Sequence, residues 1–136
     1  MANNISRNKE NKLTMISIYN ALVRIEMNDE IHLEEMMGDI FETDFENIPT
    51  HSKLIVVKAL KNLDEIIEVF QANMPKWKFH RINKLCQAIL IMSYVNYKLI
   101  GDIDKKVVIN IAVDLAKEYL DPNDYKFVNA ILDNVL

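Results

Sequence analysis

The sequence has few of the residues that turn or break a chain, with two glycines and three prolines in 136 residues. Gly38 and Gly101 lie too far apart to form the glycine-rich loop that cradles a phosphate, which excludes Rossmann and P-loop nucleotide sites. An all-β fold needs a break roughly every 8–12 residues, and this chain has too few turn-forming residues for that. The scarcity of both residue types therefore predicts a mostly helical protein.

Cysteine and long apolar runs are also scarce. Cys86 is the single cysteine, so the chain forms no internal disulfide and no cysteine-based zinc site, which favours a reducing compartment. No apolar run approaches the roughly 20 residues of a membrane span, and the polar start MANNISRNKENK is unlike a signal peptide. We therefore expect a cytoplasmic protein of one domain over residues 1–136, without a membrane segment.

Motifs for catalysis and metal binding are missing as well. The three histidines are isolated from one another, and His32 lacks the second histidine of an HExxH zinc motif. The carboxylates concentrate on one strongly charged segment, where acid–base work is not expected without a pocket to shift their pKa values. Cys86 has only apolar neighbours and is interpreted as a small buried hydrophobe. We therefore predict no catalytic residue, metal ligand, cofactor or small-molecule substrate.

Charge is distributed unevenly along the chain, although the net charge is only −4. Residues 26–46 carry nine acids and no Lys or Arg, whereas the segments 1–24 and 76–84 are basic. If the two basic segments meet in the fold, they form a patch for a polyanion. Charge runs are more often solvated helix faces, and the spacing leaves both interpretations open. The basic candidates for such a patch are Arg7, Lys9, Lys12, Lys76, Lys78 and Arg81.

Apolar side chains recur at helical spacing along most of the chain. The pattern predicts helices over residues 7–27, 30–46, 50–73, 82–97, 105–119 and 124–135. Ser6, Thr50 and Asp104 are candidate N-caps, and Gly101 is expected to end the fourth helix. That fourth helix is apolar nearly all round, which is typical of a helix buried at the centre of a bundle. We expect an all-α fold of about six or seven helices.

The arrangement of these helices suggests two halves that join near Pro75, an N-terminal half over about 1–74 and a C-terminal half over about 75–136. Small and apolar side chains in the last two helices make a packing face. The side chains expected in the core of this half are Leu115, Ala116, Phe127 and Val128.

The segment 76–81 interleaves aromatic and basic residues. Trp77 and Phe79 are able to stack on the bases of single-stranded RNA while the three basic neighbours neutralise its phosphates. The alternative is that both aromatic side chains anchor the turn in the core while the basic side chains face water. The spacing alone does not decide between them.

The second half carries blocks whose order and spacing, over about 60 residues, are specific. They are Trp77…Arg81…Ala88-Ile89-Leu90, then Val107-Val108-Ile109-Asn110, Ala112-Val113-Asp114-Leu115-Ala116-Lys117, and Lys126-Phe127-Val128-Asn129…Leu132-Asp133. This pattern resembles the family of the transcription antitermination factor NusB. The first half is similar only weakly, through a basic start followed by Ser17-Ile18-Tyr19. The resemblance implies an all-helical fold of two packed halves.

The resemblance also implies a function. The family binds the boxA RNA element together with NusE, a small-subunit ribosomal protein, so that RNA polymerase passes terminators in ribosomal RNA operons. It implies RNA contacts at the basic start, which falls here on Arg7, Lys9 and Lys12. It implies partner contacts at Tyr19 and Phe127, with Lys126 and Asn129 beside Phe127 as further candidates. Both aromatic residues are equally compatible with ordinary core positions.

Departures from the family pattern motivate two alternatives. The N-terminal arginine run is reduced to one Arg and two Lys, and Lys keeps the charge but lacks the planar guanidinium fork. One alternative is therefore a helical module that binds only proteins and has lost RNA affinity. The other is a relative of the NusB-like domain that precedes the catalytic part of some ribosomal RNA cytosine methyltransferases. The missing glycine-rich cofactor loop argues against a complete enzyme.

Overall fold

The computed structural model describes residues 5–136, and residues 1–4 of the polar start lie outside that range. Within it the chain forms seven α-helices and no β-strand, so the predicted all-α fold is confirmed. The helices are α1 (Arg7–Glu26), α2 (Leu33–Phe41), α3 (Thr50–Lys61), α4 (Leu63–Ala72), α5 (Lys84–Tyr94), α6 (Lys105–Tyr119) and α7 (Asp124–Val135). Shorter segments are the 3₁₀ turns η1 (Phe45–Asn47) and η2 (Phe79–Arg81) and the π-helix η3 (Val95–Ile100).

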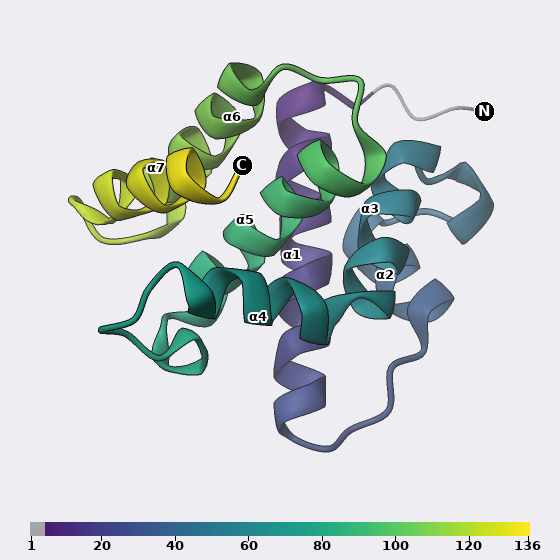
Figure 1. Cartoon of the computed structure of the whole chain (residues 1–136). Coiled ribbons are helices and arrows are strands. Elements are labelled where there is room, and N and C mark those ends of the chain that lie inside the picture. The colour runs from purple at the N-terminus through teal and green to yellow at the C-terminus, as the bar shows by residue number, and fades with distance from the viewer. Residues whose placement is uncertain (1–4) are drawn as a thin grey trace.

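Helices α1 and α5 form the centre of the molecule. Helix α1 packs against α2, α3 and α5, and α5 also packs against α4, α6 and α7. Figure 1 shows α2 and α3 on one side of α1 and the antiparallel pair α6 and α7 on the other. Every residue from Cys86 to Ser93 in α5 is buried, which confirms the prediction of a central helix that is apolar nearly all round. The boundary near Pro75 stays a prediction.

The acidic second helix is shorter than predicted. Helix α2 ends at Phe41 because the next residue, Glu42, has a left-handed backbone with φ of 55°. Gly38 permits this turn, since a Cβ at Gly38 would come within 3.1 Å of the Thr43 carbonyl oxygen. The predicted range 30–46 is therefore wrong at both ends, and Phe45–Asn47 forms a separate 3₁₀ turn.

The predicted single helix over 50–73 is wrong, because the chain is interrupted at Asn62 between α3 and α4. The Asn62 side chain donates from Nδ2 to the Lys58 carbonyl oxygen at 2.8 Å, a bond by which asparagine competes with the helical backbone. The break lets α4 change direction, and Figure 1 shows it crossing the view below α5. Helix α4 thereby packs against α5, α7 and η2.

The helix ends confirm some of the expected caps and correct others. The Ser6 side chain caps α1 by accepting from the Lys9 backbone N–H at 3.1 Å. Thr50 is instead the first residue of α3, after Pro49, and Asp104 precedes α6 without a side-chain capping bond. The helix predicted over 82–97 begins at Lys84, after an Asn83 cap, and continues as η3 until Gly101.

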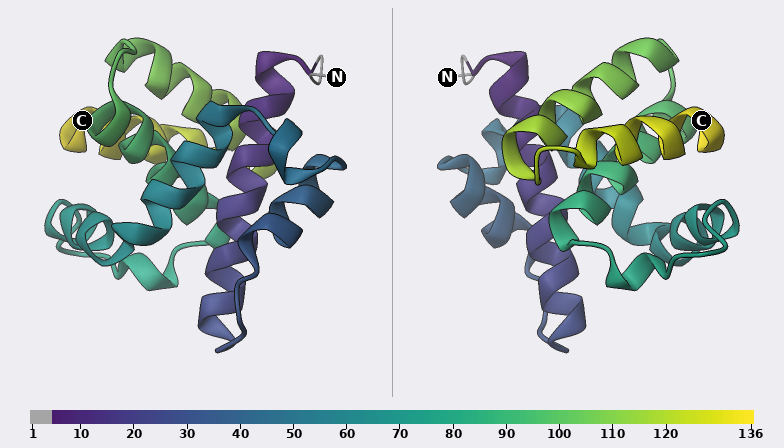
Figure 2. Two further views of the ribbon diagram at one scale, coloured as in Figure 1. Left: turned by 90° about the vertical axis from the view of Figure 1, so that its right-hand side faces the viewer. Right: turned by 90° about the vertical axis from the view of Figure 1, so that its left-hand side faces the viewer.

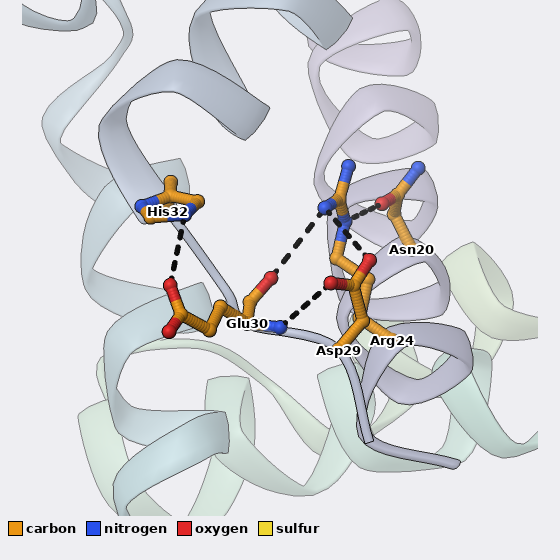
Figure 3. Close-up of polar contacts among 5 residues, drawn as sticks. All are labelled: Asn20, Arg24, Asp29, Glu30 and His32. Atoms are coloured by element: carbon orange, nitrogen blue, oxygen red, sulfur yellow. Dashed lines mark hydrogen bonds and ion pairs between the residues drawn. The ribbon is translucent and has the colours of Figure 1, made fainter. Parts of the chain in front are cut away.

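The connection between α1 and α2 is held by a polar network that Figure 3 shows. Arg24 donates from Nε to Asn20 Oδ1 at 2.8 Å and lies 3.7 Å from Asp29 Oδ2. Asp29 in turn accepts from the Glu30 backbone N–H at 2.9 Å, and His32 Nε2 lies 3.2 Å from a Glu30 carboxylate oxygen. All nine acids of residues 26–46 are exposed, so this segment is a solvated acidic face.

The core of the C-terminal helices differs from the prediction at one residue. Leu115, Ala116 and Val128 are buried as predicted, whereas Phe127 is half-buried. In α7 the inward face is taken by Val128 and by the apolar residues one and two turns further on, and Phe127 lies about 100° from Val128 around the helix axis. Its ring faces Trp77, with 6.3 Å between the ring centroids.

We expect this difference in burial to appear as a difference in stability. Phe79 is 1% exposed and stacks on Phe70 at 5.7 Å, so Phe79→Ala should lower the free energy of unfolding by about 3–5 kcal/mol. Phe127→Ala, at a half-buried position, should cost only about 1–2 kcal/mol. Urea denaturation followed by circular dichroism measures both values. Equal losses for the two variants would contradict the packing described above.

Candidate nucleic-acid interface

The chain between α4 and α5 is shaped by one side chain, Gln71. Its Nε2 donates to the Trp77 carbonyl oxygen at 2.6 Å and to the Met74 carbonyl oxygen at 3.3 Å. Its Oε1 accepts from the Phe79 backbone N–H at 2.9 Å. These bonds fix a compact turn in which Phe79 points into the core, while Trp77, two residues earlier, is 62% exposed. Phe79 therefore anchors the turn in the core, as the second interpretation proposed for both residues, whereas base stacking by the exposed Trp77 stays a prediction.

The exposed Trp77 lies in a groove of about 560 Å³ between this turn and the start of α7. We call it the basic–aromatic groove. Its walls carry two aromatic rings, three basic side chains and one carboxylate, which belong to Trp77, Phe127, Lys76, Lys78, Arg81 and Asp124. Three of the predicted RNA-binding residues are thus brought together with one predicted partner-binding residue. Trp77, Lys76, Lys78 and Arg81 are exposed.

Cys86 lies at the floor of the same groove but is only 4% exposed. Burial raises the pKa of its thiol to about 12, and the negative charge of Asp124 adds to the rise. The thiolate is the nucleophilic form of cysteine, so this thiol is inert at neutral pH. The structure thus agrees with the interpretation of Cys86 as a buried hydrophobe.

The basic residues at the start of α1 do not form one group. Arg7 and Lys9 are exposed, whereas Lys12 is half-buried and its Nζ lies 2.9 Å from Glu118 Oε2 of α6. The hydrogen bond to Glu118 raises the pKa of Lys12. Lys12 therefore joins α1 to α6, and its charge is balanced locally.

The two basic segments do not meet in the fold. Figures 1 and 2 show the first turn of α1 at the top of the molecule and the turn between α4 and α5 to one side in the lower half of every view. Lys84, the last base of the second segment, forms an ion pair with Glu26 at the other end of α1. A single continuous patch made by both segments is therefore not formed.

The remaining predicted partner contacts are of two kinds. Lys126 and Asn129 are exposed on α7 beside Phe127, next to the basic–aromatic groove. Tyr19 is half-buried and packs against the core of the bundle. Its position fits both a partner contact and an ordinary core position, the two interpretations that the sequence left open.

A second hollow, also of about 560 Å³, was missed by the sequence reasoning. It lies between the first turn of α1, His51 of α3, the end of η3 and the start of α6, and we call it the α1–η3 cavity. His51 Nε2 and Asn96 Oδ1 are 3.1 Å apart at this site, although the residues are far apart in the sequence. The one local sequence feature that could have indicated this cavity is Asn96, a polar residue at the end of a predicted helix that is apolar nearly all round.

The structure also bears on metal binding and on membrane insertion. Among residues 5–136, no group of three or more His, Cys, Asp or Glu side chains is arranged to hold a metal ion. No helix in the described part of the chain combines the length and the apolar character that crossing a bilayer requires.

Residues 5–136 thus form an all-α domain of seven helices with an exposed basic–aromatic groove on its surface. The model of the NusB family matches residues 10–136. The transcription antitermination protein NusB of Clostridium botulinum is 35% identical over 109 residues, covering 76% of this chain and 80% of that protein. NusB of Finegoldia magna is 33% identical over 137 residues, covering 97% and 94%. The chain belongs to the NusB family.

The fold of the family is also recognised in three dimensions. The solved structure of NusB from T. maritima superposes with a TM-score of 0.82 and covers 99% of this chain and 92% of that one. Its sequence identity is 22%, so this comparison shows the shared fold. The all-helical fold that the resemblance implied is therefore confirmed.

The environment of Cys86 predicts its reactivity. With a pKa of about 12, the thiol should react with an aromatic disulfide reagent at pH 8 about a thousandfold more slowly than a cysteine of ordinary pKa. The rate should rise with pH towards 12, because deprotonation then becomes favourable. Unfolding in urea, which removes the burial, should restore ordinary reactivity of the same residue. Rapid labelling of the folded protein at pH 8 would contradict a buried, protonated thiol.

Proposed function

We propose that the protein is a non-enzymatic, cytoplasmic transcription antitermination factor that binds single-stranded RNA of the boxA type together with NusE. In this proposal residues 1–136 form one domain, whose halves meet near Pro75. Membership of the NusB family supports the proposal. The observation that carries it is the basic–aromatic groove, where an exposed tryptophan lies among three cations that form no ion pair with residues 5–136.

The chemistry of this groove suits single-stranded RNA. An exposed indole keeps apolar surface in water, which is unfavourable unless a ligand covers it, and aromatic faces stack on unpaired bases. Lys76, Lys78 and Arg81 supply the charge that phosphates require. None of these three cations has an ion-pair partner among residues 5–136, so neutralising an RNA phosphate breaks no existing ion pair.

Arg7 and Lys9 provide a second point of contact at the top of the molecule. Because they lie apart from the basic–aromatic groove, RNA that touches both must run along the molecule rather than sit on one patch. The acidic face of residues 26–46 would repel RNA and so limits the paths open to it.

One observation favours the protein-only alternative. Lys12, one of the three bases that remain at the start of α1, is paired with Glu118 and adds little to an RNA site. A module that has lost RNA affinity would bind a basic partner through its acidic face and show no salt-dependent RNA binding. Measuring whether RNA binds, and how its affinity depends on salt, separates RNA binding from the protein-only alternative.

Charge-removing variants test where RNA binds. Lys76→Ala with Lys78→Ala, and separately Arg7→Ala with Lys9→Ala, should each weaken binding to a boxA-type RNA and flatten its salt dependence. Each lost phosphate contact should reduce the slope of log K against log salt by about one. Fluorescence anisotropy at salt concentrations of about 50–200 mM measures both the affinity and its salt dependence.

The matched control is Lys61→Ala with Lys106→Ala, two exposed lysines of α3 and α6 that line neither hollow. Melting temperatures of all variants should stay close to that of the unchanged protein, because the substituted side chains are exposed. If both test variants bind RNA like the control, the RNA site lies elsewhere. If the unchanged protein fails to bind RNA at low salt, the protein-only alternative holds.

We further expect RNA and NusE to bind cooperatively. A basic ribosomal protein docked beside the groove would enlarge the positive surface and restrict the path of the RNA. Phe127, with Lys126 and Asn129 beside it, and Tyr19 are the proposed docking residues. Calorimetric titration of RNA with and without NusE measures the coupling factor, which must be the same when the order of addition is exchanged. A factor near one, with RNA binding intact, would refute the cooperative mechanism.

A further inference from the structure

The interior of the α1–η3 cavity is not used by the proposed contacts. Its polar lining comes from Arg7 and Glu10 on α1, His51 on α3, Asn96 in η3 and Asp102 after Gly101. Its apolar lining comes from Ile100, Ile103 and Val107, and Val107 is 46% exposed. An apolar wall facing a few convergent polar groups is typical of a ligand site.

Asn96 is the polar group most clearly in need of a partner. Asn96 is only 6% exposed, and its Oδ1 accepts a hydrogen bond from His51 Nε2 at 3.1 Å. Its Nδ2 makes no hydrogen bond with any of residues 5–136. Among residues 5–136, every fully buried side-chain nitrogen or oxygen atom has a hydrogen-bond partner. Asn96 Nδ2 has none, so this nitrogen must be accessible, and Asn96 lines the cavity. A nearly buried donor of this kind suits a ligand that accepts a hydrogen bond from it.

The backbone around Asn96 is irregular and gives the cavity its rim. The π-helix η3 closes with the Gly101 N–H donating to the Asn96 carbonyl oxygen at 3.0 Å. Gly101 and Asp102 follow with φ of 83° and 58°. Asp102 therefore holds a left-handed conformation that is unfavourable for most residues other than glycine. π-helical turns occur frequently at functional sites.

The charges of the lining decide which ligand fits. Arg7 is opposed by the carboxylates of Glu10 and Asp102, so the cavity has no net positive charge that would hold a phosphate. A flat, uncharged heterocycle suits it better, because its faces can pack on the apolar wall while its edge meets Asn96. A nucleobase has this chemistry, and single-stranded RNA presents its bases unstacked.

We propose that the α1–η3 cavity accepts one nucleobase of single-stranded RNA. Asn96 Nδ2 donates to an acceptor on the edge of the base, Val107 and its apolar neighbours pack on the face, and Arg7 at the rim meets the adjoining phosphate. The proposal rests on the proposed RNA-binding function and adds to it a subsite that recognises a nucleobase rather than a phosphate.

The substitution Val107→Trp tests the subsite by filling the mouth of the cavity without changing any charge. The probe is the same fluorescently labelled boxA-type RNA, titrated across a range of salt concentrations. We expect affinity about tenfold lower at every salt concentration, in line with the loss of one base contact. The slope of log K against log salt should be unchanged, because no phosphate contact is removed. Arg7→Ala, by contrast, should reduce that slope by about one.

The matched control is Leu54→Trp, which places the same side chain at another exposed apolar position, on α3 and outside the cavity. It should bind RNA like the unchanged protein, and melting curves of both variants should show that they fold. Wild-type affinity in Val107→Trp, or a loss of affinity together with a loss of slope, would overturn the subsite. Absence of RNA binding by the unchanged protein would overturn the proposed function itself, and the subsite with it.

A second measurement needs no substitution. In the ¹⁵N-labelled unchanged protein, the side-chain amide resonances of Asn96 should shift on addition of the RNA. The Asn62 side-chain amide, which already donates within α3, serves as the internal control and should stay in place. Binding of RNA that leaves the Asn96 signals unmoved would refute the subsite while leaving the RNA function intact.

Discussion

The burial of α5 is the constraint on which the rest of the structure depends. Its residues from Cys86 to Ser93 are all buried, so this helix must be covered on every side. Helices α1, α3, α4, α6 and α7 supply that cover, which packs the first and the last helix against one element. The basic–aromatic groove and the α1–η3 cavity form near the two ends of α5, where these covering helices stop. Cys86, near the start of α5, is the floor of the basic–aromatic groove, and Asn96, just beyond its end, lines the α1–η3 cavity.

A second constraint acts where the chain enters α5. Gln71 satisfies three backbone groups of the turn between α4 and α5, at Met74, Trp77 and Phe79. An unsatisfied backbone group near the core is costly, so this glutamine selects one conformation of the turn. The same conformation buries Phe79 against Phe70 and leaves Trp77 facing Phe127. A single side chain in α4 thus couples the packing of the core to the shape of the proposed RNA groove.

The sequence predicted the fold well because helical periodicity and the specific blocks of the second half are local signals. It failed where a polar side chain interrupts a helix, as at Asn62, or where the chain changes direction through a left-handed residue, as at Glu42. The candidate site was predicted only in part. Lys76, Lys78 and Arg81 are close in sequence and stay close in the groove, whereas the pairing of Lys12 with Glu118 and of His51 with Asn96 joins distant segments. No spacing rule carries such information.

Ion pairing between helices decides which cations of this small protein stay exposed. The ion pairs between Lys12 and Glu118 and between Lys84 and Glu26 join α1 to α6 and to the start of α5, and they remove two cations from the basic segments. In the basic segments, Arg7, Lys9 and the three cations of the basic–aromatic groove remain exposed and form no ion pair with residues 5–136, whereas the nine exposed acids of residues 26–46 belong to a separate stretch of the chain. Interactions between exposed charges are screened beyond about 8 Å at physiological salt. An RNA that approaches the molecule is therefore attracted at the basic sites and repelled near the acidic segment, which restricts the paths that the proposed contacts leave open to it.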